Sequence, residues 1–348
     1  MTRIAVVRAL ALGDMLCAIP ALRALRARFR HARISLIGLP WATEIVDRFP
    51  MLVDELIPFP GFPGIPEVDL DPAASADSIA ELQRRRFTLA LQLQGDGSFI
   101  NEFVALLGAK RLAGFVPAGS GPPRNLPDDV WVPYPERGSE VDRLLALPAM
   151  IGAPIDRHLE FPVRDADRVA ADDLLDASGI DGAPVAVVHA GGSRPERRWP
   201  AERFAEVGDA LSDKGLTVLL TGTSSEAATT ATVARTMRSS AIDVAGRTSL
   251  GAMAGLVERA QVVVTNDTGV SHLAAAIGTD SVTIFSASDR ERWAPVGTDR
   301  NVAVGAGIPE GETGRVDVPV DDVLAATRRL LAGRTARGTA AGMRRSPR

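Results

Sequence analysis

An alternation of strand-like and helix-like segments, run through twice, constrains the fold of this chain more than any other feature. Residues 3–9 form a β-branched apolar run, and residues 15–29 then place apolar side chains at three- and four-residue spacing. The first pattern predicts a buried strand and the second an amphipathic helix. Similar pairs recur up to Phe115. Strands that alternate with helices in this way favour an α/β fold, with a parallel sheet covered by helices on both faces.

The second half of the chain repeats this alternation. A length of 348 residues favours two domains, and the polar stretch from Phe161 to Pro184 is where we expect them to join. We therefore expect two Rossmann-like domains, residues 1–165 and 166–332, that face a cleft. Ligands of such sheets bind at the carboxyl ends of the strands. The strands of the second half are expected at residues 185–189, 217–221, 261–265 and 282–285.

Two segments are expected to lack regular structure. Residues 117–135 are rich in Pro, Gly and Asp, and residues 333–348 show no apolar periodicity, so we expect a disordered tail there. That tail carries five arginines and no acidic residue, which could hold it near anionic lipid. It lacks an apolar anchor, however, and an inert end is the simpler interpretation.

Composition excludes several classes of function. The net charge of −4 gives no general argument for binding nucleic acid. The single cysteine, Cys17, excludes an intrachain disulfide, and the four histidines are scattered without the spacing of a zinc site. The chain opens without a secretory signal, and no apolar run approaches the roughly 20 residues needed to span a bilayer. We therefore expect a cytoplasmic protein, with at most peripheral contact at the inner face of the membrane.

Two Asp-x-Asp pairs match the short pattern of metal-dependent sugar transferases. Asp69 and Asp71 end a Pro-rich loop, and Asp165 and Asp167 lie in the expected linker. Three-residue patterns recur by chance in an acidic chain, so we expect no metal at either pair.

A glycine and a carboxylate follow the first strand. Gly13 permits a tight turn, and Asp14 then lies at the carboxyl end of the strand. A carboxylate in that position could act as a general base on a hydroxyl. It could equally be the N-cap of the following helix, and from this segment alone the N-cap is the favoured interpretation.

A polar turn follows the strand that ends at Thr265. Residues 266–272 read Asn-Asp-Thr-Gly-Val-Ser-His and open a helix. The free amides of Thr268 and Gly269, together with the helix dipole, could bind an anion, and Asp267 and His272 lie in the same turn. The alternative is a capped helix with a packed His272. The segment is neither a Walker loop nor the dinucleotide fingerprint.

A glycine pair and three arginines follow the first strand of the second half, in residues 189–200. The glycines let the backbone approach a ligand closely, and Ser193 lies beside them. Arg197 or Arg198 could neutralise a leaving diphosphate, since a planar guanidinium binds phosphate well. The alternative is a solvated basic loop with Trp199 packed beneath it.

Glu226 lies at the start of another expected helix, after the strand that ends at Thr221. It could bond ribose hydroxyls, as acidic residues do in related folds. It could equally be the third residue of a helix-start capping box.

Four segments of the chain together resemble glycosyltransferase family 9, the ADP-heptose heptosyltransferases. They are Gly13-Asp14 with the Ile19-Pro20-Ala21-Leu22 that follows, residues 197–200, residues 245–250, and Asn266 through His272. The resemblance covers about residues 1–310, in order. It implies a GT-B architecture, with the acceptor on the N-terminal domain and the nucleotide sugar on the C-terminal one.

The resemblance also implies site residues. Asp14 becomes the catalytic base, and Asp267, Thr268, Gly269 and His272 match the diphosphate site of the family. Glu226 matches an acidic residue that contacts the donor nucleoside. Arg197 matches a position where a characterised heptosyltransferase has lysine. The loop here is one residue longer, which leaves Arg198 as the alternative.

The function that follows is an inverting glycosyltransferase without a metal or other cofactor. Its donor would be a nucleotide sugar, ADP-heptose in the best-known members, and its acceptor a glycan, a glycolipid or a small glycoside. Two other functions suit the same scaffold, namely a nucleotide-sugar epimerase and a binding protein without turnover.

Overall fold

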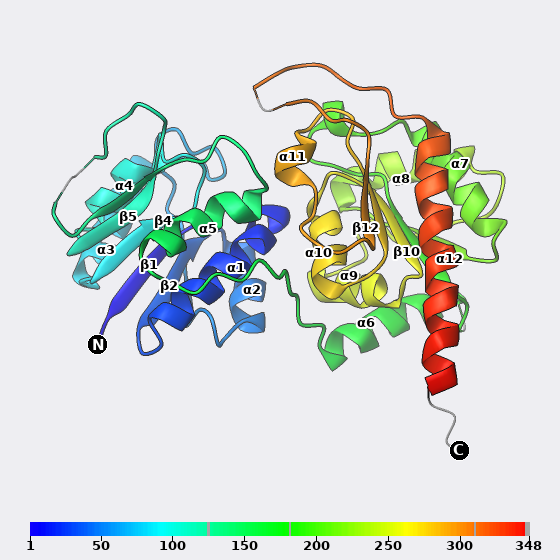
Figure 1. Cartoon of the computed structure of the whole chain (residues 1–348), viewed down its shortest axis with the longest axis horizontal. Coiled ribbons are helices and arrows are strands. Elements are labelled where there is room, and N and C mark those ends of the chain that lie inside the picture. The colour runs from blue at the N-terminus through cyan, green and yellow to red at the C-terminus, as the bar shows by residue number, and fades with distance from the viewer. Residues whose placement is uncertain (124–125, 181, 310, 345–348) are drawn as a thin grey trace. The chain divides into compact units, whose positions relative to one another are not determined.

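The computed structural model describes residues 1–123, 126–180, 182–309 and 311–344. The chain forms two compact units, residues 1–158 and the chain from Leu159 onward (Figure 1). The boundary expected at residue 165 lies seven residues further along the chain than this one. Leu159 and Phe161 are buried, so the segment before the first helix of the second unit already belongs to that unit.

The first unit holds six parallel strands in the spatial order β3-β2-β1-β4-β5-β6. This is the order of a Rossmann sheet, whose direction of winding reverses between β1 and β4. The strands are β1 (Arg3–Val7), β2 (Arg33–Gly38), β3 (Glu55–Pro58), β4 (Leu89–Gln92), β5 (Arg111–Val116) and β6 (Val130–Pro133). The helices are α1 (Leu12–Arg28), α2 (Thr43–Arg48), α3 (Pro72–Arg84), α4 (Ile100–Leu106) and α5 (Glu140–Met150).

Alternating side chains of the first sheet pack under its helices. Ala5 and Val7 of β1 face a cluster that includes Leu82 of α3 and Phe103 of α4. α1 packs against α5. The central strands therefore have helices on both faces. Side chains on both faces of these strands are buried, which explains why their sequences are continuously apolar and do not alternate between apolar and polar residues.

The second unit repeats the same topology. Its six parallel strands lie in the order β12-β11-β10-β7-β8-β9, with the reversal between β7 and β10. The strands are β7 (Val185–His189), β8 (Thr217–Leu220), β9 (Ile242–Asp243), β10 (Val262–Asn266), β11 (Ser281–Ile284) and β12 (Asn301–Val304). The helices are α6 (Asp165–Asp176), α7 (Ala201–Ser212), α8 (Ala227–Thr236), α9 (Leu250–Arg259), α10 (Gly269–Ile277), α11 (Arg290–Trp293) and α12 (Val320–Arg344).

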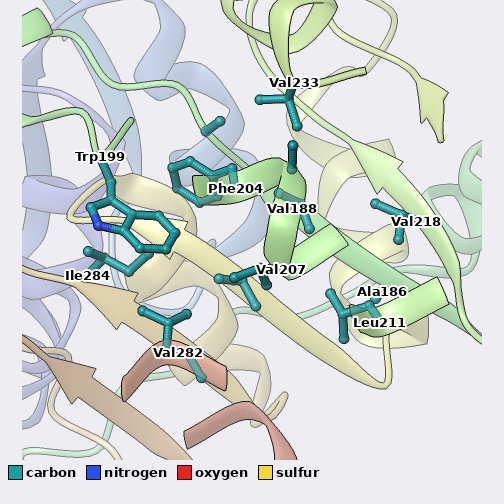
Figure 2. Close-up of a cluster of buried hydrophobic side chains, with 14 of the residues drawn as sticks. Ala186, Val188, Trp199, Phe204, Val207, Leu211, Val218, Val233, Val282 and Ile284 are labelled. Carbon is teal, nitrogen blue, oxygen red and sulfur yellow. The ribbon is translucent and has the colours of Figure 1, made fainter. Parts of the chain in front are cut away.

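The core of the second unit lies between its sheet and the helices α7, α8 and α12. Val188, Val282 and Ile284 of the sheet meet Phe204 and Val207 of α7 in this cluster (Figure 2). Trp199 packs edge-on against Phe204, with ring centroids 5.1 Å apart. Trp199 is thus a core residue, and its packing anchors the loop that precedes α7.

The segment from Gly333 differs from the expected disordered tail. α12 continues through it to Arg344, and residues 345–348 lie outside the described part of the chain. Alanine and arginine are strong helix formers, and their frequency in this segment offsets its lack of apolar periodicity. Among the described residues, no helix combines the length and the apolar character needed to cross a membrane.

Candidate active site

The loops that follow β7 and β10 meet at the reversal of strand order in the second sheet. Asn266, the last residue of β10, donates through Nδ2 to the carbonyls of Ala190 and Gly191, each at 2.9 Å. Its Oδ1 accepts the backbone N–H of Trp199 at 2.9 Å. A Cβ on Gly192 would lie 3.7 Å from Cγ2 of Thr268. The glycine loop and the start of α10 therefore form one continuous surface at the carboxyl edge of the sheet.

The start of α10 presents backbone amides at this surface. Thr268 is the extended residue before the helix, and its side chain makes no cap hydrogen bond to the helix. Its Oγ1 lies 3.1 Å from Oγ1 of Thr265 instead. The first N–H groups of an α-helix have no acceptor within the helix, and they carry the positive end of its dipole. This geometry suits an anion such as a diphosphate.

The other two residues predicted at this turn differ in exposure. Asp267 is half-buried, whereas His272 lies inward on α10 and is 3% exposed. Packing of His272 was the alternative interpretation for this residue, and the structure favours it. A direct contact between His272 and donor remains a prediction from the family resemblance.

Glu226 is held by the loops around it. Its Oε1 accepts the N–H of Gly192 at 2.5 Å, and its Oε2 accepts the N–H and the hydroxyl of Thr223 at 2.7 and 2.9 Å. The capping box with Thr223 is present at the start of a 3₁₀ turn, Ser224–Glu226. Glu226 therefore joins the loop after β7 to the loop after β8. A contact between Glu226 and the ribose of a donor would be an additional role.

Charge at Glu226 is linked to the buried imidazole of His189. Burial lowers the pKa of His189, although the carboxylate of Glu226 opposes that shift. Burial raises the pKa of Glu226, but hydrogen bonds from Thr223 and the nearby His189 outweigh it, so this pKa lies below its ordinary value. Glu226 therefore favours its charged form, in which it accepts the hydrogen bonds of Gly192 and Thr223.

The arginines of the loop after β7 divide into two roles. Nε of Arg198 donates to the carbonyl of Gly192 at 2.8 Å, which fixes the loop. Arg197 instead lines a cavity of about 360 Å³ together with Arg194, Arg292 and Ser288. Arg198 thus supports the loop. The cavity beside Arg197 is not lined by Gly192, Thr268 or Gly269, so the role of Arg197 at the diphosphate stays a prediction from the family resemblance. Ser193 is exposed in the same loop.

Asp14 lies in the first turn of α1, at the reversal of strand order in the first sheet. The residue before this helix is Ala11 and not Asp14, so the N-cap interpretation of Asp14 is wrong. Gly13 precedes it within the helix. The Asp14 side chain is 25% exposed, and its Oδ1 lies 3.8 Å from the guanidinium of Arg8. The carboxylate is thus accessible to a substrate and paired with a cation.

Arg8 itself is a residue that sequence reasoning missed. It follows β1, is 1% exposed, and donates to the backbone carbonyls of Asp14 and Leu93. Its guanidinium also bonds Oε1 of Glu140 at 3.3 Å, and Oε2 of Glu140 accepts from the hydroxyl of Tyr134 at 3.2 Å. The sequence did carry a signal for this network, because Arg8 directly follows a buried strand. An arginine at such a position is expected to be buried, and a buried cation requires a partner of opposite charge.

The two Asp-x-Asp pairs have structural contacts. Asp71 caps α3 by accepting the N–H groups of Ala73 and Ala74. Asp165 pairs with Arg168, and Asp167 accepts the N–H of Arg164. Across the described ranges, no three histidine, cysteine or acidic side chains gather as a metal site would require.

Comparison with known proteins decides the family. Residues 77–315 match the family model described as glycosyltransferase family 9 (heptosyltransferase). This chain belongs to glycosyltransferase family 9. The resemblance seen in the sequence motifs is thereby confirmed.

A curated heptosyltransferase matches part of the chain at low identity. The chain is 29% identical over 146 residues to lipopolysaccharide heptosyltransferase 3 of Escherichia coli (strain K12), which covers 38% of this chain and 42% of that protein. The match thus spans less than half the length of that curated relative.

Solved structures extend the likeness to nearly the whole chain. A glycosyl transferase family 9 protein from Veillonella parvula has a TM-score of 0.79 at 20% identity, covering 95% of this chain and 98% of that one. The E. coli ADP-heptose LPS heptosyltransferase II has a TM-score of 0.73 at 20% identity, covering 96% and 100%. At this identity the likeness shows the fold, and the expected pair of Rossmann-like domains of GT-B type is confirmed.

Proposed function

We propose that this protein is an inverting glycosyltransferase that moves a heptose from an ADP-linked donor to a hydroxyl of a glycan or glycolipid, without a divalent metal. The observation that carries the proposal is the joined surface of the Gly191–Gly192 loop and the start of α10, in a member of family 9. Its backbone amides suit a diphosphate, and Arg197 of the same loop after β7 supplies a cation. The donor is taken from the name of the E. coli heptosyltransferase of the same fold.

In the proposed reaction, Asp14 is the general base. It accepts the proton of the acceptor hydroxyl while that oxygen attacks the anomeric carbon. The bond from the anomeric carbon to the β-phosphate oxygen breaks, and ADP leaves with the electron pair. Arg197 and the amides of Thr268 and Gly269 stabilise the charge that develops on the diphosphate, which is the part that a metal plays in other transferases. A single displacement inverts the anomeric configuration.

A thermal-shift panel of ADP, UDP, GDP and dTDP tests the donor. A ligand that binds only the native state raises its melting temperature, and we expect ADP to give the largest rise. Equal shifts from all four nucleotides, or a preference for another base, would remove the adenine assignment.

Product analysis separates the proposed reaction from its competitors. Incubation of the enzyme with ADP-heptose alone should leave the sugar unchanged, whereas an epimerase would produce an isomer. A binding protein would be stabilised by nucleotide but would transfer no sugar to any acceptor tried.

Treatment with excess EDTA tests the absence of a metal. Sugar transfer should continue in EDTA, and a complete loss of transfer that magnesium restores would overturn the metal-free mechanism.

A further inference from the structure

A groove lies at the amino-terminal edge of the second sheet, the edge opposite to the proposed donor site. It has a volume of about 730 Å³. Pro184 precedes β7, Leu216 precedes β8 and Gln261 precedes β10, and all three line it. Residues 328–334 of α12 form its other side. A volume of this size falls in the range of ligand-binding pockets, and none of the proposed transfer chemistry uses it.

The groove combines an apolar floor with a cationic rim. Leu216 and Leu331 pack against the core of the second unit and present their remaining surface to the groove. Lys214, Arg328 and Arg334 also line it. Among the described lining residues there is no carboxylate, and no described residue forms an ion pair with these three cations. Such a groove suits an amphipathic anion, with the apolar part on the floor and the charge at the rim.

The sequence beyond the groove favours a surface and not a small soluble anion. From Arg328 to the end, the chain carries seven arginines and no acidic residue. Within α12, Arg328, Leu331 and Ala332 have the i, i+3, i+4 spacing of one helix face. Cations grouped with apolar side chains on one helix face are typical of helices that contact anionic lipid.

We propose that this groove binds an anionic phospholipid and docks the amino-terminal edge of the second unit on an anionic membrane surface. The phosphate of the headgroup lies between Lys214 and Arg328, and the upper part of an acyl chain covers Leu216 and Leu331. This proposal does not depend on the reaction that the enzyme catalyses.

Co-sedimentation of the full chain with vesicles tests the proposal. We expect binding to vesicles that contain phosphatidylglycerol and none to vesicles of phosphatidylcholine alone. One cation near an anionic surface is worth about a fivefold change in binding. The double variant Lys214→Glu/Arg328→Glu should therefore bind at least roughly tenfold more weakly, although its arginine-rich end is intact.

A matched control separates the groove from net charge. Arg30 and Arg137 are exposed in the first unit, and Arg30→Glu/Arg137→Glu makes the same change in charge, so it should bind like the wild type. Ala332 is exposed within the groove, and Ala332→Asp should weaken binding without disturbing the core. Wild-type binding by the groove variants, an equal loss in the control, or binding of hexyl phosphate without binding of vesicles would each overturn the proposal.

Discussion

Asn266 accepts the backbone N–H of Trp199 at 2.9 Å, and this bond ties the end of β10 to the loop that carries Arg197. The same side chain holds the carbonyls of Ala190 and Gly191, and it is 1% exposed. A buried amide with three hydrogen bonds is costly to disturb. Asn266 therefore positions the loop of residues 190–199, which we propose to contact the diphosphate of the donor.

Asn266→Asp should destabilise the protein and weaken nucleotide binding. The carboxylate can still accept the N–H of Trp199, but it has no N–H to donate to the carbonyls of Ala190 and Gly191. It also places a negative charge against these two carbonyl oxygens. We expect a loss of about 2–4 kcal/mol in the free energy of unfolding, measured by urea denaturation, together with loss of the ADP thermal shift.

The control for this variant is Asn301→Asp. Asn301 donates to the carbonyl of Thr279 and to the hydroxyl of Ser281, near the amino-terminal edge of the same sheet. This variant should lose stability yet keep the ADP shift. If Asn266→Asp also keeps that shift, Asn266 has no positioning role.

Gly191→Ala should disturb the same loop by a steric route. A Cβ at this position would lie 2.4 Å from Cδ of Glu226, which must then move and release the N–H of Gly192. Forced overpacking of this kind costs about 1–3 kcal/mol, and the shift caused by ADP should shrink. Gly121→Ala is the control, because a Cβ there meets nothing within 4 Å. An unchanged melting temperature for Gly191→Ala would show that Glu226 can relax freely.

The central strands of both sheets and the edge strand β3 could be predicted from the sequence, and the edge strands β6, β9 and β12 could not. β6, β9 and β12 each lie at the edge of a sheet and are mostly half-buried. An edge strand has one neighbour and less cover, so it lacks the apolar run that marks a central strand. β6 lies within residues 117–135, whose Pro and Gly content predicted irregular structure, so that prediction is wrong for Val130–Pro133.

The position of the site could be predicted, but part of its supporting network could not. Loops after buried strands indicated the carboxyl edge of each sheet, and Asp14, Thr268 and Arg197 lie there. Asn266 binds Trp199, 67 residues away in the chain, and Arg8 binds Leu93 and Glu140, 85 and 132 residues away. No local pattern reports contacts of that separation. For Asp14 the sequence left two interpretations open. The position of Ala11 before the helix excludes the N-cap interpretation, and the general-base role stays a prediction.

Arg8 and Glu140 form a buried pair whose disruption should be severe. Arg8→Met leaves the Glu140 carboxylate, 2% exposed, without its cation. Breaking a buried pair from one side costs about 3–5 kcal/mol. In Arg8→Met/Glu140→Gln the buried charge that Arg8 balanced is also removed, so the double variant should be more stable than Arg8→Met. Urea denaturation of the four proteins gives the coupling energy, and strictly additive losses would show that the two side chains do not interact.

The stability of the first unit should depend on Glu55 in acid. Hydrogen bonds from Arg33 and Ser35, with the nearby Arg85, lower the pKa of Glu55 from 4.5 to about 2 against the opposing effect of burial. A carboxylate whose pKa is lower in the folded state stabilises that state above the unfolded pKa, and this contribution is lost as the pH falls from about 4.5 through about 2.

Glu55→Gln should therefore cost stability at pH 7 and cost progressively less below pH 4.5. With 22% of the side chain exposed, solvent screening reduces the expected loss at neutral pH to about 1–2 kcal/mol. Urea denaturation from pH 7 to about pH 3 measures the difference between the two proteins. Glu81→Gln, which removes an exposed pair with Arg84, should change little at any pH. A Glu55→Gln loss that stays constant over this range would contradict the argument.

Asp14→Asn is the variant that separates the proposed chemistry from binding. The amide preserves size and can still lie beside Arg8, whose guanidinium is 3.8 Å from Oδ1 in the wild type, but it cannot accept the proton of a hydroxyl. Loss of a general base lowers turnover by roughly a hundredfold or more, while the ADP thermal shift should be unchanged, because the proposed donor residues lie in the second unit. Asp77→Asn, at an exposed position on α3, makes the same chemical change in the same unit and should transfer at the wild-type rate. Near wild-type turnover by Asp14→Asn, measured with a saturating donor, would remove the base assignment and leave the nucleotide site intact.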